Sequence, residues 1–104
     1  MTEFEEMQDF YKSLYDVHKH WGNLMPMMAM EEAGEFIQAI SKVERYRATE
    51  AYSPVDDMCD EIGIQNVMKE AADLYIAIGA LGYRYGYSMS DIERFAKQKL
   101  NKKY

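Results

Sequence analysis

Apolar residues recur every three or four positions through most of the 104-residue chain. This is the period of one face of an α-helix. The stripes predict helices over residues 3–21, 26–45 and 64–85, with a fourth helix running to about residue 100, and no credible strand pattern is present. We therefore expect an all-α fold, in which short connections favour an up-and-down, four-helix bundle-like arrangement.

Local signals predict where these helices begin and end. Pro26 suits the first turn of the second helix, because proline lacks an N–H that would be unpaired there in any case. Gly82 or Gly86 is expected to close the third helix. Ser90 and Glu93 have the three-residue spacing of a capping box and are predicted to open the fourth helix.

The connection between the second and third helices is less regular. Residues 46–53 lose the helical period and are expected to form a loop. Ser53, Pro54 and Asp56 then predict the cap of a short helical piece. We expect that piece to break at Gly63.

Composition indicates a single domain over residues 1–104 and narrows the classes of partner. With 18 acidic and 12 basic residues, the net charge of −6 should repel duplex nucleic acid. No apolar run approaches the roughly 20 residues of a membrane-spanning helix. The acidic start lacks the pattern of a secretory signal, and Cys59 has no second cysteine to pair with, so a cytoplasmic location is expected. Because so small a domain buries a modest share of its surface, we also expect a homodimer or a tetramer built as a dimer of dimers.

Four carboxylates carry the main chemical signal. Glu32 and Glu35 lie three residues apart on the second predicted helix, and Glu70 and Asp73 have the same spacing on the third. Residues three apart share a helix face, so the two pairs can face one point. Four acids near an apolar helix would repel one another unless a cation neutralised them. Oxygen ligands alone favour Mg²⁺, with Mn²⁺ possible, and therefore a phosphate ester or anhydride as substrate.

Two other interpretations of these acids remain open. Exposed acids commonly form ion pairs, here with residues such as Lys42 or Lys69. A di-iron bundle is a second metal hypothesis, but it requires Glu-x-x-His, and Asp73 occupies the histidine position.

The segments HWGNLMPMMAMEEAGEFIQAI, KEAADLYIAIGAL and FAKQKLNKKY together resemble the MazG-like branch of the all-α nucleoside triphosphate pyrophosphohydrolases. The resemblance implies a MazG fold, Mg²⁺ held by Glu32, Glu35, Glu70 and Asp73 as the catalytic acids, and hydrolysis between the α and β phosphates to a nucleoside monophosphate and pyrophosphate. It further implies phosphate contacts from Lys99, Lys102 and Lys103. The chain departs from the family in the long connection over residues 36–69 and in Lys97, which replaces a common asparagine.

Other candidate residues have two readings each. Trp21 can stack on a nucleobase or anchor the core, and the terminal lysines can bind phosphate or complement a helix dipole. His18 and His20 are not expected to bind metal. The leading expectation is a pyrophosphohydrolase of standard or modified nucleoside triphosphates, including deoxynucleotides. The alternatives are a phosphoribosyl-ATP pyrophosphohydrolase and a non-catalytic helical interaction module.

Overall fold

The computed structural model describes residues 1–48 and 57–103, with side chains over 1–48 and 61–102. Its elements are α1 (Glu3–Trp21), a short 3-10 turn η1 (Gly22–Leu24), α2 (Met25–Arg47), α3 (Asp57–Tyr85) and α4 (Met89–Lys103). The described residues contain no strand, so the all-α prediction is confirmed. None of the described helices is both long and apolar enough to cross a membrane.

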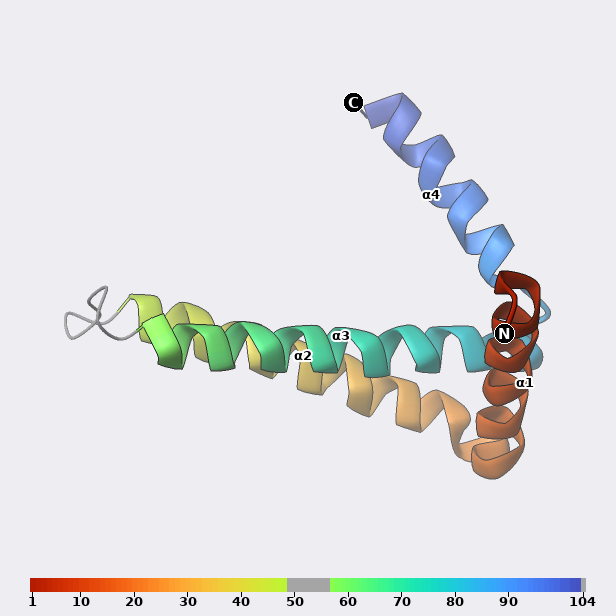
Figure 1. The fold of residues 1–104 in the computed structure, drawn as a ribbon, viewed down its shortest axis with the longest axis horizontal. Coiled ribbons are helices and arrows are strands. Elements are labelled where there is room, and N and C mark those ends of the chain that lie inside the picture. Colours follow the sequence, from red (N-terminus) through yellow and green to blue (C-terminus); the bar gives the residue numbers. More distant parts are fainter. Residues whose placement is uncertain (49–56, 104) are drawn as a thin grey trace.

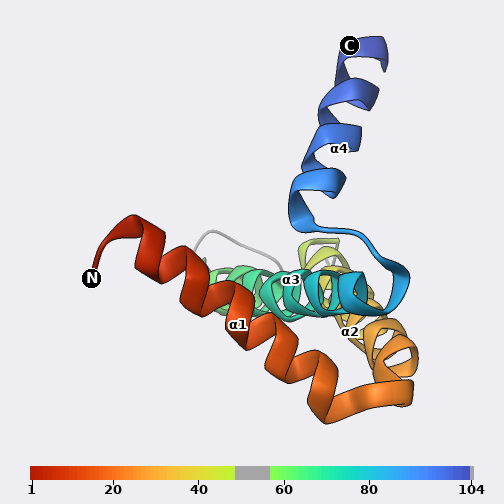
Figure 2. The same ribbon diagram turned by 90° about the vertical axis from the view of Figure 1, so that its right-hand side faces the viewer.

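The helices α2 and α3 form an antiparallel pair that makes up the body of the molecule (Figure 1). Helix α1 crosses this pair at the end where η1 leads into α2, and it packs mainly on α3. Helix α4 leaves the body and projects outwards in both views (Figures 1 and 2). Within one chain, therefore, the four helices do not close into the up-and-down bundle that the short connections favoured.

The core lies where α1, α2 and α3 meet. Its fully buried members are Met25, Ala77 and Ala80, and Leu14 of α1 is also buried. Leu14 lies directly against Gly79, where an added Cβ would be 2.8 Å from a Leu14 methyl carbon. Small residues on α3 thus let α1 and α2 approach its backbone closely.

The predicted helix break at Gly63 is wrong. Helix α3 runs without interruption from Asp57, although the expected cap at Ser53, Pro54 and Asp56 lies outside the described residues. A Cβ at Gly63 would lie 2.9 Å from Cγ2 of Val43 on α2. The glycine is therefore needed for close packing of two helices, and the surrounding helix tolerates its weak propensity.

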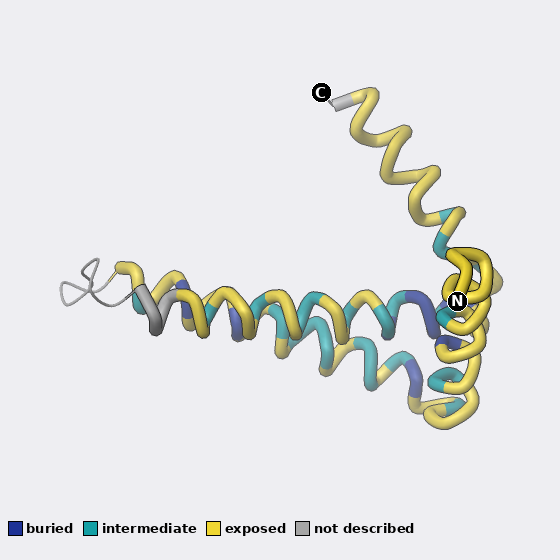
Figure 3. Tube along the Cα trace, in the orientation of Figure 1, coloured by how far each residue is buried: buried dark blue, intermediate teal, exposed yellow. Residues whose placement is uncertain are grey.

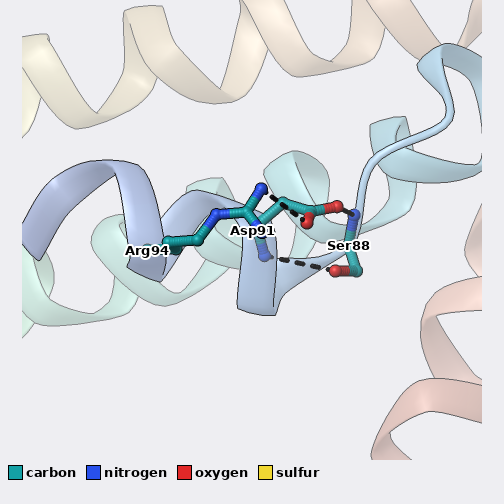
Figure 4. Close-up of polar contacts among 3 residues, drawn as sticks. All are labelled: Ser88, Asp91 and Arg94. Atoms are coloured by element: carbon teal, nitrogen blue, oxygen red, sulfur yellow. Dashed lines mark hydrogen bonds and ion pairs between the residues drawn. The ribbon is translucent and has the colours of Figure 1, made fainter. Parts of the chain in front are cut away.

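The capping box of α4 lies two residues before the predicted one at Ser90 and Glu93. The Ser88 hydroxyl accepts from the Asp91 N–H at 3.2 Å, and the Asp91 carboxylate accepts from the Ser88 N–H at 2.9 Å (Figure 4). Hydrogen bonding to its carboxylate from Ser88, first from the backbone N–H and then from the side chain, lowers the pKa of Asp91, with a smaller contribution from Arg94. The earlier start follows from the end of α3, because Gly86 takes a positive φ of 76° directly after Tyr85.

Candidate metal centre

The antiparallel packing of α2 and α3 brings acids from both helices together. Carboxylate oxygens of Glu32, Glu70 and Asp73 lie within 4.8 Å of one another. Glu32 projects from α2, whereas Glu70 and Asp73 project from the same face of α3, three residues apart. The residues paired by spacing in the sequence are thus neighbours in space, while their metal and catalytic roles stay predictions.

Glu35 lies at the edge of this group. It is more exposed than Glu32 and does not share the 4.8 Å cluster. Its negative charge nevertheless raises the pKa of both Glu32 and Glu70, so the fourth predicted acid is close enough to interact with an acid on each helix.

The pKa values of two of the acids, Glu32 and Glu70, are raised. The pKa of Glu32 is raised first by loss of hydration and then by the charges of Glu35, Asp73 and Glu70. The pKa of Glu70 is raised by the same loss of hydration and by Glu35 and Asp73, with Lys69 acting weakly in the opposite direction. Burial and like charge both disfavour the ionised form, so bringing a cation to this point would relieve both.

The hydrogen bonding around these acids is also consistent with a bound cation. One oxygen of Glu32 and one of Glu70 are buried without any hydrogen-bond partner. Within the described part of the chain, no lysine or arginine lies within ion-pair distance of the four acids, so neither Lys42 nor Lys69 satisfies them. Buried carboxylate oxygens without partners are costly and call for an explanation such as an ion.

The geometry suits a small divalent cation. Two oxygens bound to Mg²⁺ at about 2.1 Å can be at most about 4.2 Å apart. The three carboxylates lie within 4.8 Å of one another, so their side chains would have to move closer together to bind one such ion. The donor set contains oxygen alone, which favours Mg²⁺ or Mn²⁺ over zinc or copper.

A hollow of about 200 Å³ adjoins the acids. Glu32 and Asp73 contribute carboxylates to its lining, and Trp21, 36% exposed, is a further lining residue. The rest of the lining is apolar, and it consists of Val17, Met28 and Ile76. A larger hollow of about 350 Å³ elsewhere between α2 and α3 has no acid among its described lining residues, so the smaller one is the better match to the acids.

The sequence singled out Met28 as one of several methionines that could form an adaptable pocket, but Val17 and Ile76 were not predicted, although a signal for them was present. Met28 precedes Glu32 by four residues, Ile76 follows Asp73 by three, and Val17 precedes Trp21 by four. Residues so spaced share a helix face. The helix faces that carry the acids and Trp21 therefore also carry these apolar residues, one turn away along each helix.

The two histidines lie apart from the acid cluster. The His18 ring stacks on Tyr83 with centroids 5.6 Å apart, and its Nδ1 is buried without a hydrogen-bond partner. His20 packs edge-on against Trp21 at 5.2 Å, where it helps to orient the indole. Neither belongs to the group of metal-capable side chains found among the described residues.

The predicted phosphate-binding lysines are not brought to the acids within one chain. Lys99 and Lys102 lie on α4, which projects away from the α2–α3 pair (Figure 1). The side chain of Lys103 lies outside the described residues. Phosphate binding by these lysines stays a prediction.

Comparison with known proteins adds no assignment. No protein-family model matches the chain, and no curated protein and no solved structure is significantly similar to it. The function must therefore be inferred from the residues and their geometry.

Proposed function

We propose that this chain is a Mg²⁺-dependent nucleoside triphosphate pyrophosphohydrolase with a MazG-like fold. The observation that carries the proposal is the meeting of Glu32, Glu70 and Asp73 within 4.8 Å, with Glu35 beside them and two buried carboxylate oxygens left without partners. The resemblance of the two acidic motifs and the C-terminal segment to the MazG-like enzymes supports the same reading. Mn²⁺ is expected to replace Mg²⁺.

The carboxylates divide the work between binding and proton transfer. Glu32, Glu70 and Asp73 are the residues that would hold the cation. A divalent cation at such a site neutralises phosphate charge and orients a water molecule. Glu35 lies outside that group but interacts with Glu70, and it would accept a proton from the attacking water. The water oxygen bonds to phosphorus, the bridging bond between the α and β phosphates breaks, and pyrophosphate leaves.

We expect the hollow beside the acids to bind the nucleoside part of the substrate. Trp21 contributes a partly exposed aromatic ring to the lining, while Met28 and Ile76 contribute apolar side chains. Aromatic and thioether side chains contact flat bases without requiring one hydrogen-bond pattern. This lining therefore favours acceptance of several bases, including modified ones, in ribose or deoxyribose form.

The test is pyrophosphate release from a panel of ribo- and deoxyribonucleoside triphosphates, with Mg²⁺, Mn²⁺ or chelator. We expect metal-dependent release with one monophosphate formed per pyrophosphate. Glu35→Gln and Asp73→Asn should each lower turnover by about 100-fold or more, the range for loss of a positioned acid or base. Glu31→Gln is the matched control, because Glu31 is exposed, neighbours Glu32 and lies outside the cluster.

Helical content measured by circular dichroism separates lost chemistry from lost folding. Wild-type turnover in both Glu35→Gln and Asp73→Asn would refute the assignment of the site. Phosphoribosyl-ATP belongs in the same panel, since its hydrolysis uses the same bond and yields a distinct monophosphate.

A non-catalytic interaction module remains the second candidate, and one observation favours it. Many large apolar side chains are exposed on the helices, among them Phe4, Ile37, Ile62 and Phe95. Such surfaces mark contacts with other chains. They are equally compatible with an enzyme that works as a homodimer or tetramer, and the release assay distinguishes the two functions.

A further inference from the structure

Helix α4 exposes an apolar stripe that the rest of its own chain does not cover. Phe95 and Leu100 are each 56% exposed, and Ile92, one turn before Phe95, is also exposed. Almost the whole helix is exposed along its length (Figure 3). An amphipathic helix is stable in water mainly when its apolar face packs on something.

The connection from α3 to α4 holds this helix away from the body. The Gly82 carbonyl accepts from the N–H groups of both Gly86 and Tyr87, at 2.8 and 3.1 Å. The Tyr87 hydroxyl donates to the Ile78 carbonyl, and a Cβ at Gly82 would overlap the Tyr87 carbonyl oxygen. With Ser88 already engaged in the α4 cap (Figure 4), few torsions are left free to fold α4 back.

The charge of α4 indicates what covers it. The helix carries five basic residues against two acidic ones, and four of the basic residues lie in its second half, at Lys97, Lys99, Lys102 and Lys103. The first half of α1 has the opposite charge, with Glu3, Glu5, Glu6 and Asp9. That half also exposes apolar side chains, including Phe4 and Met7. Two amphipathic helices of opposite charge are complementary partners.

The exposed area is larger than that of a compact monomer of this mass. The accessible surface is 8203 Å², whereas a folded monomer of this mass exposes roughly 6,000 Å². The Cα radius of gyration is 17.2 Å, against about 13 Å for a compact domain of this length. The excess of about 2,000 Å² for each chain is enough for a stable interface between two copies.

We propose that two copies of this chain pair reciprocally, with the basic second half of α4 of each lying along the acidic first half of α1 of the other. Each copy contributes both surfaces, so a two-fold axis satisfies both contacts at once. The pairing buries Phe95 and Leu100 and gives the lysines of α4 acidic partners. The proposed pairing does not depend on the proposed pyrophosphohydrolase activity.

The first test measures self-association by sedimentation velocity and light scattering. The wild type should be a dimer whose affinity falls as salt increases, and Phe95→Glu should weaken it by at least about tenfold, equivalent to about 1.4 kcal/mol. Ile62→Glu is the matched control, because Ile62 is 62% exposed on α3, away from both surfaces. A monomeric wild type would overturn the proposal, as would a dimer split by Ile62→Glu and indifferent to Phe95→Glu.

The second test uses charge reversal on each surface. One variant carries Glu6→Lys and Asp9→Lys on α1, and the other carries Lys97→Glu and Lys99→Glu on α4. Each alone should be monomeric, with helical content retained by circular dichroism. Mixed together, they should form a heterodimer. In each homodimer α1 and α4 carry the same charge, whereas in the mixture the basic helices of one variant face the acidic helices of the other.

The mixture also distinguishes the competing contacts. If α4 folded onto its own α1, mixing would restore nothing. If the α4 stripe bound an anionic membrane, the wild type would cosediment with vesicles containing phosphatidylserine and the charge-reversed α4 would not, with dimerisation unaffected in both. Either result would overturn the proposal.

Discussion

Replacing Gly63 with alanine should destabilise the fold, although alanine is the better helix former. The new Cβ would lie 2.9 Å from Cγ2 of Val43, whereas ordinary contacts lie at 3.4–4 Å. Val43 is buried and β-branched, so its methyl group cannot turn aside without leaving the χ1 rotamer that helices strongly prefer. The helices must separate by several tenths of an ångström at this point.

The size of the effect follows from two opposing terms. Overpacking a closely fitted contact costs about 1–3 kcal/mol, and replacing glycine by alanine in a helix interior gains about 1 kcal/mol. The net loss is therefore about 1 kcal/mol, or about 4–8 °C in Tm for a domain near this size. Gly34→Ala in α2 is the matched control, since its Cβ would meet nothing within 4 Å. That variant should gain about 1 kcal/mol.

Urea unfolding followed by circular dichroism measures both variants, at one protein concentration because association affects apparent stability. The difference between the two should be about 2 kcal/mol, with opposite signs relative to wild type. If Gly63→Ala stabilised the protein as much as Gly34→Ala, the close packing of α2 on α3 at Gly63 would be refuted.

Three further results are expected. Mg²⁺ at 100 times its Kd should stabilise the wild type by about 2.7 kcal/mol in thermal unfolding, and Asp73→Asn should lose this stabilisation. The pKa values of Glu32 and Glu70 are raised in the folded protein, so near these pKa values the folded state binds more protons than the unfolded state. The stability of the metal-free protein should therefore fall as pH rises from the unfolded pKa of 4.5 through the raised values. In urea titrations, Glu70→Gln should show a flatter dependence of stability on pH and greater metal-free stability at neutral pH. Trp21→Ala should raise KM with a smaller effect on kcat, and nucleotide should quench the fluorescence of the wild-type indole, since Trp21 is the sole tryptophan.

The sequence by itself predicted the helices and the meeting of the acids. Three apolar stripes match α1, α2 and most of α3, because helical periodicity is a local property. The carboxylate pairs could be found for the same reason, since a three-residue spacing places two side chains on one face of any helix. That the two faces meet required only that α2 and α3 pack against each other, as neighbouring helices usually do.

Only the tertiary structure decided the features that depend on distance between helices. Gly63 has the sequence signature of a break, yet it lies inside α3 because Val43 of another helix needs the space. Ser90 and Glu93 have the spacing of a capping box as good as that of Ser88 and Asp91, and the backbone turn at Gly86 selects the earlier pair.

The same limit applies to the site and to α4. Local sequence cannot tell that Trp21, Glu32 and Asp73 line one hollow, because they belong to three different helices. Nor does the sequence of a basic amphipathic helix indicate whether the rest of its own chain will cover the apolar face. The hydrogen bonds of Tyr87 point α4 away from the body. The α4 lysines therefore project away from the acids with which the family resemblance grouped them.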